Sequence, residues 1–213
     1  MPKITALRPQ KRNSRRVNVS LDGEFAFGLA ASLLGSLQVG DELVQDEIQA
    51  LQRKDSVEAA RQRAVRLISR RPRSERELRR YFARHEVPQE VAEAALAELR
   101  QTSLVDDEAF AETWVENRTA FRPRGELALR AELKAKGVPR LAIEAALEDF
   151  AEEEAIWAAG RKAARRYQNL SKDDFRQRVG AYLGRRGFRY PMIASVVDGL
   201  WQSTADDESE VDL

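Results

Sequence analysis

Apolar residues in the C-terminal three quarters of the chain recur every three or four positions, as they do along the buried side of an α-helix. The first such stripe is made of Val57, Ala60, Ala64 and Ile68. Pro72 follows it, and a proline stops a helix because it has no amide hydrogen and clashes with the preceding turn. The pattern predicts a helix that ends before this proline.

The next thirty residues predict two more helices. Ser74 and Glu77 form an S-x-x-E capping box, in which each side chain bonds a free amide at the start of a helix. Pro88 suits the first turn of the helix that follows, where no amide hydrogen is needed. The expected buried stripes are Leu78, Tyr81 and Phe82 in the earlier helix, and Val91, Ala95 and Leu99 in the later one.

This three-helix unit recurs along the chain. The segment Arg71–Ser74 (RPRS) is matched 51 residues later by Arg122–Gly125 (RPRG). The segment Leu133–Gly137 (LKAKG) is matched fifty residues later by Leu183–Gly187 (LGRRG). Glycine is the residue that most readily adopts the left-handed conformation at a helix end, so each of these segments is expected to close a helix.

The repeats predict an all-α fold, because three-helix units must stack on one another to bury their apolar sides. We expect an elongated, curved stack of three such repeats. Their predicted bounds are residues 55–105, 106–151 and 152–202. The acidic residues 203–213 are expected to form a disordered tail.

The first 54 residues predict a small α+β cap. Asp22 and Gly23 separate two stretches of strand character, and Asp-Gly supplies the positive φ angles of a tight hairpin turn. Residues 3–7 could add a third strand. Residues 8–16 are expected to be a mobile basic loop. Two short helices are predicted at residues 29–37 and 44–51, separated by Gly40.

Composition excludes several protein classes. Of the 213 residues, 43% are hydrophobic, which is enough for a core, and 7% are aromatic. The abundance of Ala, Leu, Arg and Glu disfavours an all-β protein. No apolar run is long enough to span a membrane, no apolar segment follows the basic N-terminus as in a secretory signal, and there is no cysteine. We therefore expect a cytoplasmic protein without disulfides or cysteine-ligated metals.

The net charge of +1 hides strongly charged blocks. Residues 61–84 hold ten arginines and two carboxylates, whereas residues 85–116 hold nine carboxylates and one arginine. Residues 160–190 are again strongly basic. Such blocks suit contact with a polyanion or with an acidic protein groove. The alternative is that they are solvated helix faces paired with neighbouring acids.

Motifs of catalysis are absent from the sequence. It contains no phosphate-binding GxxxxGK[ST] loop, no GxGxxG and no GxSxG, and His85 is the only histidine. Asp107, Glu132 and Lys134 follow the D…ExK order of metal-dependent nucleases, but all three fall in predicted helices rather than on the strands that fix such metals. We expect a protein that is not an enzyme and that binds no cofactor or metal.

Three strings carry a resemblance to a known family. They are Arg73–Leu78 (RSEREL), Asp106–Ala111 (DDEAFA) with Trp114 following, and the helix ends at Gly137 and Gly187. On three-helix repeats, this combination resembles the RecX family of bacterial recombination regulators, over about residues 55–201. The N-terminal hairpin is not carried by every member, and the acidic tail matches no family motif.

The resemblance implies a modulator, mainly an inhibitor, of the RecA recombinase. RecX-family proteins bind the groove or end of the RecA–single-stranded DNA filament. They lower its ATP hydrolysis, strand exchange and co-protease activity, and so act in DNA repair, recombination and the SOS response. The partners implied are RecA and this filament, and weak direct DNA binding by a monomer is also expected.

Because the resemblance offers no invariant residues to transfer, candidate contacts are chosen from charge placement. The basic residues at the turns and middle helices of the three repeats, and on the first helix of the third, are the candidates for filament or DNA binding. They are Arg70, Arg71, Arg73, Arg76, Arg79, Arg80, Arg84, Arg122, Arg124, Lys134, Lys136, Arg161, Lys162, Arg165, Arg166, Arg185, Arg186 and Arg189. Two alternative functions share these features, namely a stand-alone DNA-binding protein and a helical-repeat scaffold for another protein.

Overall fold

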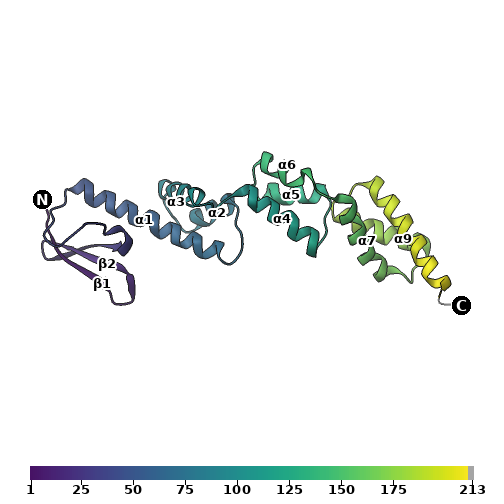
Figure 1. The fold of residues 1–213 in the computed structure, drawn as a ribbon, viewed down its shortest axis with the longest axis horizontal. Helices are drawn as coiled ribbons and strands as arrows, with labels where there is room; N and C mark the ends of the chain where they lie inside the picture. Colours follow the sequence, from purple (N-terminus) through teal and green to yellow (C-terminus); the bar gives the residue numbers. More distant parts are fainter. Residues whose placement is uncertain (211–213) are drawn as a thin grey trace. The chain divides into compact units, whose positions relative to one another are not determined.

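The computed structural model describes the backbone of residues 1–210 and the side chains of residues 1–203. Three strands precede nine α-helices in this part of the chain (Figure 1). The strands are β1 (Ile4–Gln10), β2 (Asn13–Leu21) and β3 (Glu24–Ala30), followed by the 3-10 helix η1 (Ala31–Leu33). The helices are α1 (Gln45–Ile68), α2 (Glu75–Arg84), α3 (Gln89–Gln101), α4 (Asp107–Phe121), α5 (Glu126–Lys136), α6 (Arg140–Glu148), α7 (Glu152–Tyr167), α8 (Lys172–Arg185) and α9 (Tyr190–Glu210).

The chain divides into two compact units. Unit 1 comprises residues 1–73 and 78–105, and unit 2 comprises residues 74–77 and the chain from 106 onward. The first turn of α2 therefore belongs with unit 2, although the rest of this helix belongs with unit 1. The predicted fold class, three helical repeats after a small N-terminal α+β cap, is confirmed.

The N-terminal sheet of unit 1 has the antiparallel order β1-β2-β3. The predicted hairpin turn is confirmed, since Asp22 has φ 50° and Gly23 has φ 94°. The predicted third strand is β1, whose Pro9 is tolerated because β1 lies at an edge of the sheet. The sheet and the start of α1 share one core, whose buried side chains are Ile4, Val19, Phe27, Leu29, Leu43 and Ile48.

Three predictions for the cap are wrong. The basic segment 8–16 is not a mobile loop, because most of it lies in β1 and β2 and only a short turn joins them. The predicted helix 29–37 is replaced by the end of β3 and the three-residue η1, since Leu29 continues the alternating burial of the strand. The predicted short helix 44–51 is instead the first part of α1, which runs on to Ile68 because neither glycine nor proline interrupts it.

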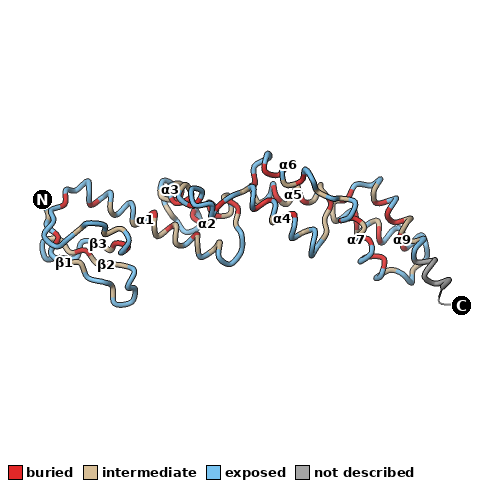
Figure 2. Tube along the Cα trace, in the orientation of Figure 1, coloured by how far each residue is buried: buried red, intermediate tan, exposed pale blue. Residues whose placement is uncertain are grey.

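Each repeat buries its own core, as the red segments of the three helix groups show (Figure 2). In unit 1, Leu78 and Phe82 of α2 are fully buried with Ala64 of α1 and Leu99 of α3. In unit 2, helices α4–α6 enclose one core and helices α7–α9 another. No helix in the described part of the chain is long and apolar enough to cross a membrane.

Glycines end the middle helices of the second and third repeats, as predicted. Gly137 and Gly187 both adopt φ 83°, the left-handed conformation that closes a helix at lowest cost in glycine. Residues 203–213 were expected to form a disordered tail, but the backbone of α9 remains helical through Glu210. The last three residues of that segment lie outside the described part of the chain.

Candidate functional site

The candidate arginines of the first repeat lie on α2 and in the turn that precedes it. Arg76, Arg80 and Arg84 are exposed, whereas Leu78 and Phe82 are fully buried. Arg79 is exposed too, but it forms an ion pair with Glu93 of α3. At the turn before α2, Arg70 and Arg71 are exposed. Arg73 is half-buried, and its Nε atom is shielded from solvent. The exposed members of this set present positive charge to solvent.

In the second repeat, the carboxylate of Glu132 accepts two hydrogen bonds and forms an ion pair with the candidate Arg124. Trp114 Nε1 and Arg118 Nε donate hydrogen bonds of 2.9 and 2.7 Å to Glu132 Oε2. Arg124 Nε lies 3.4 Å from Glu132 Oε1. Lys136 lies over the Trp114 ring, with Nζ 4.8 Å from the ring centroid. Arg124 and Lys136 thus stabilise the repeat, while Arg122 and Lys134 remain exposed.

The candidates of the third repeat fall into two groups. Four candidate cations of α7 are exposed, and of these Arg166 lies against its neighbour Tyr167. Arg185, at the end of α8, is exposed as well. The next two candidates are engaged, because Arg186 donates to the carbonyl of Pro123 at 2.8 Å and Arg189 pairs with Glu126 at 3.2 Å. The exposed set of α7 is Arg161, Lys162, Arg165 and Arg166.

Several engaged candidates lie in joints that recur within unit 2. At one joint, Lys136 Nζ pairs with Glu77 at 2.8 Å, and Arg76 packs on Gly137. At the other, Arg189 pairs with Glu126 of α5. In each case the start of a middle helix meets the end of the middle helix of the following repeat. Charge placement in the sequence could not separate these structural cations from exposed ones.

The residues of the nuclease-like order are occupied by structural contacts. Asp107 Oδ1 accepts a 2.9 Å hydrogen bond from the backbone amide of Glu75. Glu132 accepts hydrogen bonds from Trp114 and Arg118 and forms an ion pair with Arg124. Lys134 lines a separate pocket together with Arg130 and Arg140. No group of three or more potential metal-ligating side chains occurs among the residues that the structure describes.

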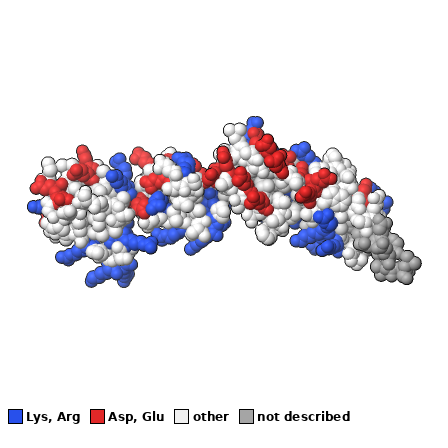
Figure 3. Space-filling view, in the orientation of Figure 1, with Lys and Arg blue, Asp and Glu red and all other residues white. Residues whose placement is uncertain are grey.

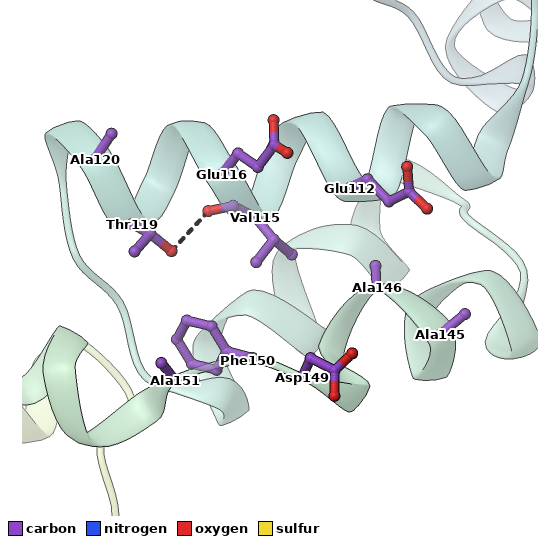
Figure 4. A pocket seen from close by; sticks show the side chains of 10 residues that line it. All are labelled: Glu112, Val115, Glu116, Thr119, Ala120, Ala145, Ala146, Asp149, Phe150 and Ala151. Atoms are coloured by element: carbon purple, nitrogen blue, oxygen red, sulfur yellow. Dashed lines mark hydrogen bonds between the residues drawn. The ribbon is translucent and has the colours of Figure 1, made fainter.

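The second repeat carries an acidic groove of about 490 Å³ (Figure 4). Glu112 and Glu116, one helical turn apart on α4, flank it together with Asp149 at the end of α6. Its floor is apolar and includes Val115 and Phe150. In Figure 3, Asp and Glu side chains gather over this part of unit 2. Such a surface repels phosphates and favours basic and apolar protein groups.

Unit 1 carries a basic cleft that charge-based reasoning on the repeats missed. The cleft, of about 390 Å³, lies between the β1–β2 hairpin and α1. It is lined by Arg12, Asn13, Ser14, Arg15, Arg16, Ala30, Glu58, Ala59, Gln62 and Arg66. The sequence did contain a signal, since residues 1–20 hold six basic side chains and no acid. Because the sequence predicts a mobile loop for residues 8–16, these side chains were not among the candidate contacts.

Ion pairs fix the base of this cleft. Arg16 makes a two-pronged contact with Asp55 of α1, at 2.7 and 3.2 Å. Asp55 also accepts a 2.7 Å hydrogen bond from the amide of Ala30, so one carboxylate fastens β2, β3 and α1 together. Hydrogen bonding from Arg61 lowers the pKa of the Glu58 carboxyl, against the effect of burial, and Gln62 adds to the lowering. The carboxylate at the rim is thus already neutralised.

Comparison with known families assigns most of the chain, in order. Residues 2–43 match the model described as the regulatory protein RecX N-terminal domain. Residues 60–99, 106–147 and 151–197 match the first, second and third three-helix domains of RecX.

Individual relatives agree along nearly the whole chain. The regulatory protein RecX of Bacillus velezensis is 33% identical over 217 residues, covering 100% of this chain and 82% of its own length. That of Levilactobacillus brevis is 32% identical, covering 98% and 80%. A crystal structure of regulatory protein RecX has a TM-score of 0.76 at 29% identity, covering 93% of this chain and all of that one. RecX from Lactobacillus salivarius shares the fold, with a TM-score of 0.60. The chain therefore belongs to the RecX family of regulatory proteins.

Proposed function

We propose that this protein regulates RecA by binding the RecA–single-stranded DNA filament, in its groove or at its end. The observation that carries the proposal is the ordered match of the N-terminal domain and all three helical domains to regulatory proteins named RecX. Binding would lower ATP hydrolysis, strand exchange and co-protease activity, and thereby temper recombinational repair and the SOS response. The protein would act in the cytoplasm as a monomer and would not catalyse a reaction itself.

The distribution of charge supports a nucleoprotein target. Exposed candidate cations without an ion pair among the described residues can meet phosphates; they include Arg70, Arg80, Arg122, Lys134, Arg161, Lys162, Arg165 and Arg185. The acidic groove of the second repeat, in contrast, repels DNA and suits a protein surface with basic groups. A filament made of protein and DNA offers both kinds of surface at once.

The test is the DNA-dependent ATP hydrolysis of RecA during titration with this protein, well below one copy per RecA. We expect inhibition at substoichiometric ratios, because one bound copy on a filament would affect many RecA protomers. Reversing charge at Arg161 and Arg165 together should weaken the inhibition. Full ATP hydrolysis up to equimolar protein, with folding verified by circular dichroism, would rule out the RecA assignment and favour a scaffold or a stand-alone DNA-binding protein.

A further inference from the structure

We propose that the cleft between the β1–β2 hairpin and α1 binds the sugar–phosphate backbone of a single-stranded nucleic acid. Arg12, Arg15 and Arg66 are the phosphate-contacting groups. The inference rests on the proposed function in that it gives the DNA-contacting role a site, and places that site where the N-terminal sheet meets α1.

The backbone at the start of β2 directs consecutive side chains into one cleft. In a regular strand, consecutive side chains point to opposite faces. Here the five consecutive residues 12–16 all line the same cleft. The pairing of β1 with β2 explains this, because the register shifts between Pro9, which pairs with Val17, and Gln10, which pairs with Asn13. Such a bulge redirects side chains, and bulges are frequent beside functional sites.

The hairpin reaches beyond the rest of the sheet. Strand β3 pairs with β2 only as far as Arg16, which lies opposite Ala30. Residues 13–15 of β2 therefore extend past the end of β3 towards the face of α1 that carries Ala59 and Gln62. The Arg16–Asp55 contact holds the two sides of the cleft at a fixed separation. Arg16 is thus a positioning residue rather than a ligand-binding one.

The remaining arginines of the cleft are available to a ligand. Arg12, Arg15 and Arg66 are exposed, and their guanidinium groups form no ion pair among the described residues. The one carboxylate in the lining, Glu58, is paired with Arg61. Guanidinium groups bind phosphate oxygens through two parallel hydrogen bonds, so these three arginines favour a phosphate over an uncharged ligand.

The other lining residues and the surrounding basic surface indicate an extended strand rather than a single ion. Asn13, Ser14 and Gln62 can hydrogen-bond sugar and phosphate oxygens, and no aromatic side chain lines the cleft for base stacking. Exposed Arg8 and Lys11 continue the positive surface at the hairpin. Arg63 continues it on α1, and Arg70 lies just beyond the end of this helix. Figure 3 shows Lys and Arg gathered along this side of unit 1. A cleft of about 390 Å³ within a basic band suits one sugar–phosphate backbone.

The experiment measures binding of the full chain to a fluorescently labelled oligothymidine by anisotropy, at several salt concentrations and without RecA. Each phosphate contact on a single strand contributes about 0.7 to the slope of log affinity against log salt. Replacing both Arg12 and Arg15 by alanine should reduce this slope by about 1.4 and weaken binding at low salt at least about fivefold. Adding Arg66→Ala should lower the slope by a further increment of about 0.7.

The matched control removes two exposed cations of unit 1 that neither line the cleft nor belong to the candidate contacts, Arg53→Ala with Lys54→Ala. It has the same net charge as the double hairpin variant, and its slope should stay within error of the unmodified protein. Equal losses in the two variants would overturn the proposal, because binding would then follow net charge alone. Tighter binding to a duplex of the same length than to the single strand would overturn the assignment to one strand.

This experiment separates the inference from the proposed function. If the hairpin variant loses DNA affinity, the site is supported whatever RecA does. If it binds oligothymidine as well as the unmodified protein does, the cleft assignment fails, while inhibition of RecA ATP hydrolysis can still be observed. Circular dichroism of each variant shows that a lost affinity does not come from unfolding.

Discussion

The hydroxyl of Ser74 donates a 2.7 Å hydrogen bond to the main-chain carbonyl of Lys136, 62 residues further along the chain. The same oxygen accepts the amide of Glu77, so one buried hydroxyl caps the start of α2 and satisfies the end of α5. Gly125 occupies the equivalent position one repeat later, and its amide donates to the carbonyl of Arg186 at 2.9 Å. The positive end of one helix dipole meets the negative end of another at both places, which stabilises the joints.

Replacing Ser74 by alanine should destabilise unit 2, because the substitution leaves the carbonyl of Lys136 and the helix amide of Glu77 without their partner. The expected cost is about 1–3 kcal/mol in the free energy of unfolding. Urea unfolding followed by circular dichroism would measure it. Ser56→Ala is the control, since the exposed Ser56 hydroxyl only bonds back to its own helix. Equal midpoints for the two variants would show that the joint contributes nothing to stability.

Gly125 should tolerate no side chain, although its φ of −76° suits any residue. A Cβ at this position would overlap the carbonyl of Gly187 and approach the amide of Phe188 to 2.7 Å. Gly125→Ala should therefore cost about 1–3 kcal/mol by forcing two backbones apart.

Gly180, inside α8, provides the matched comparison. A Cβ there would make an ordinary 3.7 Å contact with Ile193. Gly180→Ala should stabilise the protein by about 0.5–1 kcal/mol, because alanine restricts the unfolded chain and favours a helix. Thermal unfolding midpoints that move in opposite directions for the two substitutions confirm the steric explanation; a shared direction contradicts it.

Asp107 should make stability fall as pH rises. Burial raises the pKa of its carboxyl above the ordinary value of 3.8, and the charges of Glu75 and Asp106 act in the same direction, while the hydrogen bond from the Glu75 amide opposes them. The folded state then binds the proton more tightly than the unfolded state, so this group's penalty appears as pH rises from 3.8 through the raised pKa and is complete above it.

Asp107→Asn tests this, because asparagine keeps an acceptor for the Glu75 amide without the charge. We compare the free energy of unfolding of the variant with that of the unmodified protein. The difference in favour of the variant should be largest at pH 7 and should shrink as pH falls below the raised pKa of Asp107. Urea midpoints measured from pH 3 to 7 give this difference. A difference that grows on acidification would contradict the sign. Asp107→Ala, which leaves the amide unpaired, should be less stable than the asparagine variant.

The repeat pattern made most of the helical fold predictable. Residues such as Leu78 and Phe82 recur at helical spacing, and the capping and glycine signals at Ser74 and Gly137 are local, so they can be read without knowing the tertiary structure. The hairpin of residues 8–16 could not be recognised in this way. Its strand pairing is irregular, and the basic side chains on it hide the alternating pattern on which strand prediction depends.

The candidate site was less predictable than the fold. Charge alone selects Lys136 and Arg165 equally, yet Lys136 pairs with Glu77 and Arg165 is exposed. What separates them is a partner 59 residues away, which no local pattern reveals. Conversely, Arg15 and Arg66 are distant in the sequence and form one cleft only because the bulged hairpin extends over α1.

Arg16→Lys should weaken nucleic-acid binding without changing its salt dependence. Lysine keeps the positive charge but cannot make the two-pronged contact with Asp55, so the hairpin loses its fixed position over α1. We expect a several-fold weaker affinity for labelled oligothymidine with the same log–log salt slope as the unmodified protein. Direct phosphate binding by Arg16 would be indicated instead by Arg16→Ala lowering the slope by about 0.7 while Arg16→Lys leaves affinity intact.

Reversing charge in the acidic groove should separate protein contact from DNA contact. Glu112 and Glu116 are exposed on one side of α4 beside the apolar floor of the groove. If this surface meets basic groups of RecA, Glu112→Lys with Glu116→Lys should raise severalfold the concentration of protein needed for half-inhibition of ATP hydrolysis. Affinity for oligothymidine alone should stay equal or increase, because lysine attracts phosphate.

The same net change of charge made elsewhere provides the control for the groove. Glu24→Lys with Glu42→Lys alters two exposed carboxylates of the N-terminal cap, which belongs to unit 1. This variant should inhibit RecA as the unmodified protein does. Unchanged inhibition by the groove variant would exclude the groove as a RecA-binding surface. Equal losses in both variants would show that net charge, through long-range electrostatics, governs the association rather than a defined contact, because such steering depends on the summed charge and not on its position.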